Sequence, residues 1–261
     1  MHLERRIDNF KKKKGVRILI YIAASITLIG GLVQNGKEIK NFVMVTFLQK
    51  TFLYETIDKL TTDVQVSYFD KLLGKPAIIQ PWWSEEFPRY KQYIYINDDY
   101  FVKTIADDSN TVLYYAITTR KQDFNPNLPS VFGKDLKLGK DKINDINAEP
   151  EYFSLDASSK FEYYQESYYF GNIGNYGSYL IGGYSPSEYS QDFSESDYSI
   201  YEIVMEKDEE IKDSKTQDVR KTLVPNTYGV ISGSARPEFK EQIIQNLEIS
   251  IDFFDAIKFR K

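Results

Sequence analysis

Apolar positions form one uninterrupted block near the N-terminus, where residues 18–33 (ILIYIAASITLIGGLV) contain no charge. A helix of this length spans about 24 Å, slightly less than the roughly 30 Å of a hydrocarbon core. Val16 and Gln34 extend the block, and the guanidinium of Arg17 can reach the membrane interface. The pattern therefore predicts a transmembrane helix over 16–34. A cleaved signal peptide and a buried core helix are the alternatives, although no A-x-A-like cleavage site follows the block.

Charged residues beside this block predict its orientation. Residues 1–17 hold seven basic and two acidic residues, and the topology signal is the basic group Lys11, Lys12, Lys13, Lys14 and Arg17. Because such a cluster stays in the cytoplasm, we expect a cytoplasmic arm over 1–15, a single span in the inner or plasma membrane, and residues 35–261 on the other side. A second span within 41–54 is the alternative. It would return the domain to the cytoplasm, but Lys50 interrupts its apolar run.

Small residues recur every four positions along the predicted span, at Ala23, Thr27 and Gly31. Such a stripe lets two helices approach closely in a membrane, so it predicts helix association and a homo-oligomer. The alternative is that small residues are simply common in membrane spans.

After the span, apolar side chains recur at three- and four-residue intervals, which is the period of a helix. This pattern predicts a juxtamembrane helix over 35–60 and a second helix within 61–76. Thr62 or Asp63 can cap the second helix, and Gly74 is placed to end it in the left-handed conformation.

The apolar period then changes from 3.6 to 2. Residues 90–96, 101–107 and 111–119 alternate or are β-branched, and the turn sequences NDD and DDSN lie between them. These features predict a three-stranded antiparallel meander. With the helix before it, the meander makes a first α+β unit over 61–124.

The remaining residues, 125–261, predict a second, β-rich unit with a C-terminal helix. It opens with a stretch rich in Asn, Pro and Gly, and then becomes dense in tyrosine with Gly/Asn turns. We expect a strand at 198–205, a charged loop or exposed helix at 206–221, a strand–turn–strand at 222–232 and a helix at 237–259. The fold class is therefore α+β: a transmembrane helix followed by a helix and an antiparallel, aromatic-rich sheet.

The sequence LLGKP at 72–76 precedes aromatic strands, and KLGKD at 137–141 does so as well. This echo makes a duplicated helix-plus-meander unit an alternative to two unrelated units. A single match of this kind often arises by chance.

The order of elements within 58–119 resembles the small SmpA/OmlA lipoproteins of the bacterial envelope. The matching features are a helix with Val66 and Phe69, the sequence Leu73–Gly74–Lys75–Pro76, and the aromatic strands that follow. The lipidated N-terminal cysteine of that family is absent here. The resemblance implies a fold tendency and an envelope scaffold or binding module, and it implies no functional residue.

Composition narrows the chemistry further. The chain has no cysteine and His2 is its only histidine, so thiolate or imidazole catalysis and Cys- or His-ligated metals are excluded. The whole chain carries −5, and residues 35–261 alone carry −10. The electrostatic field of an acidic domain repels the phosphate backbone, so it does not favour binding of nucleic acid. We therefore expect no nucleic-acid partner, no cofactor and no metal.

Two groups of aromatic residues are the binding candidates. Trp82 and Trp83 follow a proline in a predicted loop, and Tyr168 and Tyr169 lie in the tyrosine-dense segment. Exposed aromatic rings can stack on sugars or anchor a protein interface. The alternative for the tryptophans is packing at the edge of the core. The glycines of GNIGNYG and the paired aspartates of the meander are interpreted as turns.

The sequence favours a membrane-anchored, non-enzymatic binding or assembly module with an extracytoplasmic α+β domain. Its expected partners are the lipid bilayer and a protein or glycan. One alternative is a membrane effector or toxin-type protein with a cytoplasmic sensing domain. The other is a carboxylate-based envelope hydrolase, since acidic residues are numerous.

Overall fold

A computed structural model describes residues 50–82, 84–157, 162–171, 176–185, 200, 203–204 and 214–245. Two compact units divide the chain, residues 1–53 and 54–261. Within the described ranges, no helix is both long and apolar enough to cross a membrane. The predicted span over 16–34, the basic arm, the small-residue stripe and Trp83 lie outside the described residues.

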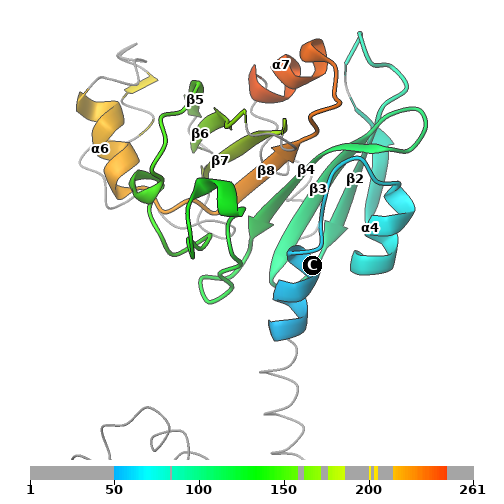
Figure 1. Cartoon of the computed structure of the whole chain (residues 1–261), viewed down its shortest axis with the longest axis horizontal. Coiled ribbons are helices and arrows are strands. Elements are labelled where there is room, and N and C mark those ends of the chain that lie inside the picture. The colour runs from blue at the N-terminus through cyan, green and yellow to red at the C-terminus, as the bar shows by residue number, and fades with distance from the viewer. Residues whose placement is uncertain are drawn as a thin grey trace, which may run out of the picture. The chain divides into compact units, whose positions relative to one another are not determined.

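One antiparallel sheet organises the second unit (Figure 1). Its strands are β1 (Ile78–Pro81), β2 (Lys91–Ile96), β3 (Tyr100–Ala106), β4 (Val112–Thr119), β5 (Tyr152–Ala157), β6 (Glu162–Tyr169), β7 (Ser178–Ser185) and β8 (Thr227–Ile231). The helices are α4 (Val66–Leu73), α6 (Ser214–Thr222) and α7 (Pro237–Gln245), with short 3-10 turns η1 (Ser130–Phe132) and η2 (Ile143–Asp145). Residues 50–57 are also helical. The α+β class is therefore confirmed.

The strand order is β1-β2-β3-β4-β8-β7-β6-β5, so the sheet consists of two four-stranded meanders. The last strand of each meander lies in the middle, where β4 pairs with β8. The sheet is continuous across both predicted units. No counterpart of α4 precedes the KLGKD segment. The residues before it are irregular, apart from the turn η1 and an isolated bridge between Asn127 and Lys137.

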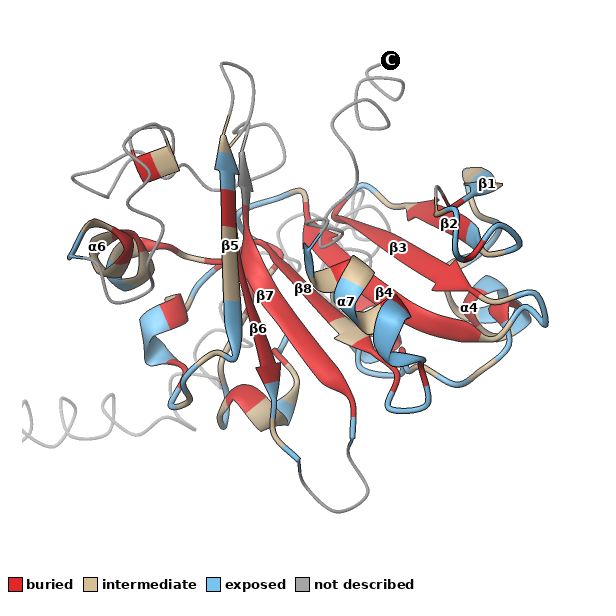
Figure 2. Ribbon diagram, turned by 90° about the horizontal axis from the view of Figure 1, so that it is seen from above, coloured by how far each residue is buried: buried red, intermediate tan, exposed pale blue. Residues whose placement is uncertain are grey.

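Both faces of the central strands are buried, as Figure 2 shows for β3 and β4. The helix α4 packs on one face, where Phe69 contacts Tyr95 and Tyr115. The helix α7 packs on the opposite face, where Phe239 joins a core cluster with Tyr114. These faces are called the α4 face and the α7 face below. The helix α6 lies beside the β5 edge.

Local patterns account for the first meander. The predicted strands at 90–96, 101–107 and 111–119 match β2, β3 and β4 within one residue. The sequence does not predict strand β1, because the strand has only four residues and ends in a proline. An alternating pattern cannot be recognised over so short a segment. The proline suits its edge position, since it lacks the N–H that an interior strand needs.

Several expected elements are corrected. Residues 200 and 203–204 are helical, so the strand predicted at 198–205 is wrong. Only β8 forms within 222–232, because residues 223–226 are irregular. The charged segment contributes helix α6, but Thr216 and Val219 are buried in it, so it is not the exposed helix that was one of the two expectations. Helix α7 confirms the start of the C-terminal helix, and residues 246–261 lie outside the described part.

The predicted N-cap of α4 is also corrected. Its N-cap residue is Gln65, which makes no side-chain cap hydrogen bond, and Asp63 instead bonds to residues near the end of the chain. Gly74 does end the helix with φ +85°, but its ψ of −165° lies outside the left-handed helical region. Glycine adopts such a conformation without a Cβ penalty.

A candidate binding groove

Two neighbouring cavities open on the α4 face where the two meanders meet. Their volumes are about 570 and 420 Å³. Both are lined by Tyr115, Pro129 and Tyr179, so the two cavities adjoin, and together they are called the groove below. The groove is defined by these shared residues and by the two segments that flank it, 57–63 and 127–131.

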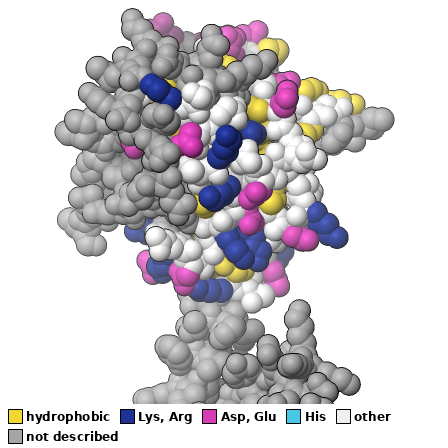
Figure 3. Space-filling model, turned by 90° about the vertical axis from the view of Figure 1, so that its left-hand side faces the viewer, with side chains coloured by type: hydrophobic (Ala, Val, Ile, Leu, Met, Phe, Trp, Pro, Cys, Tyr) yellow, Lys and Arg dark blue, Asp and Glu magenta, His cyan; other side chains and the backbone are white. Residues whose placement is uncertain are grey.

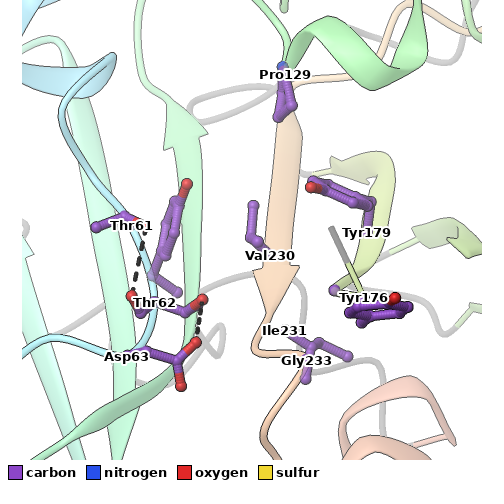
Figure 4. Close-up of a pocket in the computed structure, with 11 residues that line it drawn as sticks. Thr61, Thr62, Asp63, Pro129, Tyr176, Tyr179, Val230, Ile231 and Gly233 are labelled. Atoms are coloured by element: carbon purple, nitrogen blue, oxygen red, sulfur yellow. Dashed lines mark hydrogen bonds between the residues drawn. The ribbon is translucent and has the colours of Figure 1, made fainter. Parts of the chain in front are cut away.

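Strand β8 forms the floor of the groove. Val230 pairs with Tyr115 of β4 on one side and with Tyr179 of β7 on the other, so the three side chains share a face. Figure 4 shows Val230 between the segment 61–63 on one side and Tyr176 and Tyr179 on the other. Tyr228, two residues earlier on the same face, lines the second cavity. The groove therefore runs along β8.

A carboxylate lies at each end of this floor. Asp58 lines the cavity that contains Tyr228, and Asp63 lines the cavity that contains Ile231. No lysine or arginine is among the described residues that line either cavity. In contrast, basic and acidic side chains are interspersed on the described surface in Figure 3.

Asp63 is held by hydroxyl groups from the segment that follows β8 and from its neighbour Thr62. The Ser232 hydroxyl donates to Oδ1 at 2.6 Å and lies 2.7 Å from Oδ2. Ser234 donates to Oδ1 as well, and Thr62 donates to Oδ2 at 3.3 Å. The carboxylate is therefore fixed in position at the groove end.

The backbone at Asp63 contributes to this placement. Its φ is +61°, a region that aspartate enters more readily than most residues other than glycine. Its N–H donates to the carbonyl of Val112 at 2.8 Å, which ties the loop to the start of β4. Local strain of this kind is retained where the surrounding contacts compensate for it.

Burial changes the acidity of groups along the groove. Desolvation, followed by repulsion from Glu55, raises the pKa of the Asp58 carboxyl. Burial also raises the pKa of Tyr115 and of Tyr228 well above the usual value for a phenol. Both phenols therefore keep their protons well above physiological pH, and the two side chains lie almost fully buried beneath the groove. The Tyr115 hydroxyl donates to the carbonyl of Leu60 at 3.1 Å.

The described lining of the groove consists of hydrogen-bond donors, hydrogen-bond acceptors and aromatic rings. Among the described residues, no group of three or more His, Asp or Glu side chains is placed to hold a metal ion. The hydroxyls of Ser232 and Ser234 face Asp63, which is a weak base compared with the histidine of a hydrolytic triad.

Another cavity, of about 590 Å³, lies at the β1 edge. It is lined by residues of both signs, among them Arg89, Lys91, Asp107 and Asp108. Arg89 and Asp108 lie 4.0 Å apart and are largely exposed. Such a balanced surface shows no preference for one ligand charge, so the groove is the better candidate.

The predicted tryptophan site is only partly described. Trp82 is 3 % exposed, and its ring contacts Phe87 at 5.8 Å and Phe239 at 5.1 Å between centroids. Its side chain therefore packs in the core, which was the alternative expectation, and it presents no surface for stacking. Trp83 lies outside the described residues.

The predicted tyrosine pair does not form one surface. Successive residues of a strand point to opposite faces, and Tyr168 is buried on the α4 face whereas Tyr169 is 42 % exposed on the α7 face. The Tyr168 hydroxyl donates to Glu166, which also accepts from Tyr164 and from Arg220 of α6. Tyr168 thus belongs to a buried polar network.

Sequence reasoning missed the groove residues. Tyr115, Tyr179 and Tyr228 lie in three different strands, and no regular sequence spacing relates their positions. Tyr176, which is 54 % exposed at the groove rim, and Tyr179 both lie within the tyrosine-dense stretch of the sequence, whereas Tyr115 and Tyr228 lie outside it. The available signal was an excess of tyrosine in strands, and it could not show which tyrosines meet.

Comparisons with known proteins add little. No family model matches the chain, and no curated protein matches it at a significant level. A solved structure of a proposed β-lactamase inhibitor protein from Streptococcus mutans is similar over 54 % of this chain and 93 % of that one. The sequence identity is 15 % and the TM-score is 0.26, which is too low to carry an argument. The resemblance to the SmpA/OmlA lipoproteins stays a prediction.

Proposed function

We propose that this chain is a membrane-anchored, non-enzymatic binding module whose groove accepts an extended segment of a protein partner. The observation that carries the proposal is the groove itself, with Val230 between Tyr115 and Tyr179 at the junction of the two meanders. Tyr176, which is 54 % exposed at the rim, offers contact area and a hydroxyl group for hydrogen bonding, and tyrosines are enriched at protein interfaces.

The shape of the groove favours a peptide segment over a compact small molecule. Two joined cavities follow β8 from Tyr228 to Ile231, which corresponds to about 10 Å of extended chain. Pockets for small molecules are mostly apolar and enclosed, whereas this groove is lined at both ends by carboxylates and hydroxyls. A chain segment can follow its length and bond to both ends.

Membrane anchorage is proposed from the sequence. The uncharged block at 18–33 is preceded by Lys11, Lys12, Lys13 and Lys14, and this order favours a span with a cytoplasmic N-terminus. The domain with the groove would then lie outside the cytoplasm. The effector alternative needs the domain inside, so topology distinguishes the two.

Peptide selection tests the binding proposal. The full chain in detergent micelles is presented with random peptides displayed on phage, and the affinities of the selected peptides are measured by fluorescence anisotropy. We expect Tyr176→Ala to weaken binding by about tenfold, as truncation of an interface anchor does, and Val230→Tyr to block the floor. Ile79→Ala is the matched control, since Ile79 is 59 % exposed but lies at the β1 edge.

Two outcomes would contradict the proposal. The first is that no selected peptide is sensitive to Tyr176→Ala or to Val230→Tyr while urea unfolding shows both variants folded. The second is that oligosaccharides bind in the groove and peptides do not, which would favour a glycan partner.

A further inference from the structure

We infer that the groove selects partner segments that carry positive charge, so that a lysine or arginine side chain binds at each end of the groove floor. This inference rests on the proposed function and names the chemistry of its partner. The occupant is a segment of another protein, because in the proposed topology the chain's own basic arm lies across the membrane.

The charge of the groove is the first argument. Asp58 and Asp63 line opposite ends, and the described lining residues include no lysine or arginine to neutralise them. The walls between these ends are uncharged. Both aspartates are exposed, so a cation at either end is attracted through a Coulomb interaction that solvent and salt partly screen.

The state of Asp63 is the second argument. An ionised carboxylate has about four acceptor positions, and the hydroxyls of Thr62, Ser232 and Ser234 supply at most three donors. One position is left for a donor from a ligand. Because the hydroxyls already fix the carboxylate, a cation does not have to order it on binding.

The floor suits the rest of a basic side chain. Lysine and arginine stems are apolar and pack along hydrophobic surface while their charged ends reach polar groups. Val230 is partly exposed on the floor, and the exposed ring of Tyr176 at the rim can attract a cation. A neutral or acidic segment would offer neither carboxylate an opposite charge.

Defined peptides test this inference. Three short peptides alternate valine with lysine, with serine or with glutamate, and each is titrated into the full chain in detergent micelles. We expect the lysine peptide to bind most tightly, and Asp58→Asn and Asp63→Asn each to weaken it by about two- to fivefold, as for partly exposed charge pairs. Higher salt should weaken it further.

The control separates local from general attraction. Glu149 is exposed and lines neither cavity, so Glu149→Gln removes one negative charge and should leave affinity for the lysine peptide unchanged. An equal loss in this variant would show that only the net acidity of the domain attracts the peptide, and would overturn the inference.

The remaining outcomes distinguish the inference from the proposed function. If the serine or glutamate peptide binds as tightly as the lysine peptide and Tyr176→Ala weakens it, the groove binds peptides without preferring cations, so the inference fails and the function stands. If no peptide responds to Tyr176→Ala, both fail.

Discussion

Glu166 is completely buried, and its carboxylate accepts hydrogen bonds from two tyrosines and from Arg220. The Arg220 Nε lies 2.6 Å from Oε1, and the two side chains are 13 % and 0 % exposed. Desolvation lowers the pKa of the guanidinium, but the adjacent carboxylate outweighs this effect and raises it overall. The network joins α6 to β6, so its main role is to hold the helix on the sheet.

Removing the charge of Glu166 tests that role. Glu166→Gln leaves Arg220 buried beside a neutral partner, and we expect the free energy of unfolding to fall by about 3–5 kcal/mol, as for other broken buried ion pairs. Urea denaturation followed by circular dichroism measures it. Asp108→Asn, in the exposed pair with Arg89, should change stability by less than about 1 kcal/mol. Equal effects in the two variants would show that burial does not matter here.

Tyr100 gives stability a dependence on alkaline pH. Burial and then the nearby Asp99 carboxylate raise its pKa to about 12 from the ordinary 10.0. The folded state therefore keeps a proton that the unfolded chain loses. Its contribution to stability is fully present below pH 10 and is lost as pH rises towards 12.

Unfolding measured between pH 8 and 12 checks this dependence. Stability should be flat at first and then fall above pH 10, and Tyr100→Phe should reduce the slope by up to about 1.4 kcal/mol per pH unit. Other buried tyrosines, such as Tyr95, contribute in the same direction because burial raises the pKa of their phenols too. An unchanged slope in the Phe variant would mean that Tyr100 does not take part.

At the scale of elements, the pairing of β6 with β7 depends on Gly182. A Cβ at this position would lie 2.1 Å from the carbonyl oxygen of Tyr164, so the two backbones could not keep their separation. Backbone atoms cannot move aside as the end of a flexible side chain can. The glycine is required here by close approach.

Gly182→Ala should therefore cost about 2 kcal/mol or more of unfolding free energy. The matched control is Gly74→Ala, because a Cβ there meets nothing within 4 Å and only the φ of +85° is unfavourable. That variant should cost about 1 kcal/mol, the lower end of the range for a backbone conformation that is almost restricted to glycine. Thermal or urea unfolding measures the stability of both variants. A smaller loss of unfolding free energy in Gly182→Ala than in Gly74→Ala would contradict the requirement for close approach at Gly182.

At the scale of the whole molecule, the side of the membrane on which the domain lies can be measured directly. The chain has no cysteine, so Ser109→Cys in the exposed β3–β4 turn creates a unique thiol. We expect a membrane-impermeant maleimide to label it in intact cells. Labelling only after lysis would place the domain in the cytoplasm and support the effector alternative. Glu149→Cys, in a separate exposed loop, checks that the result does not depend on one site.

The sequence by itself determined the α+β class, the three strands β2 to β4 and the start of α7. These elements follow from the spacing of apolar residues and from turn residues within a few positions of one another, so neighbouring residues carry the information. Composition likewise excluded cysteine and histidine chemistry. The strand expected at 198–205 failed because alternation over a few residues does not distinguish a strand from a buried helical turn.

Only the tertiary structure decided which distant segments meet. Strand β8 inserts between β4 and β7, and this pairing brings Tyr115 and Tyr179 to either side of Val230. Asp63 and Ser232 are 169 residues apart yet share a hydrogen bond. Such contacts depend on register and packing across the whole sheet, which no local pattern encodes, so the groove became visible only once the chain was folded.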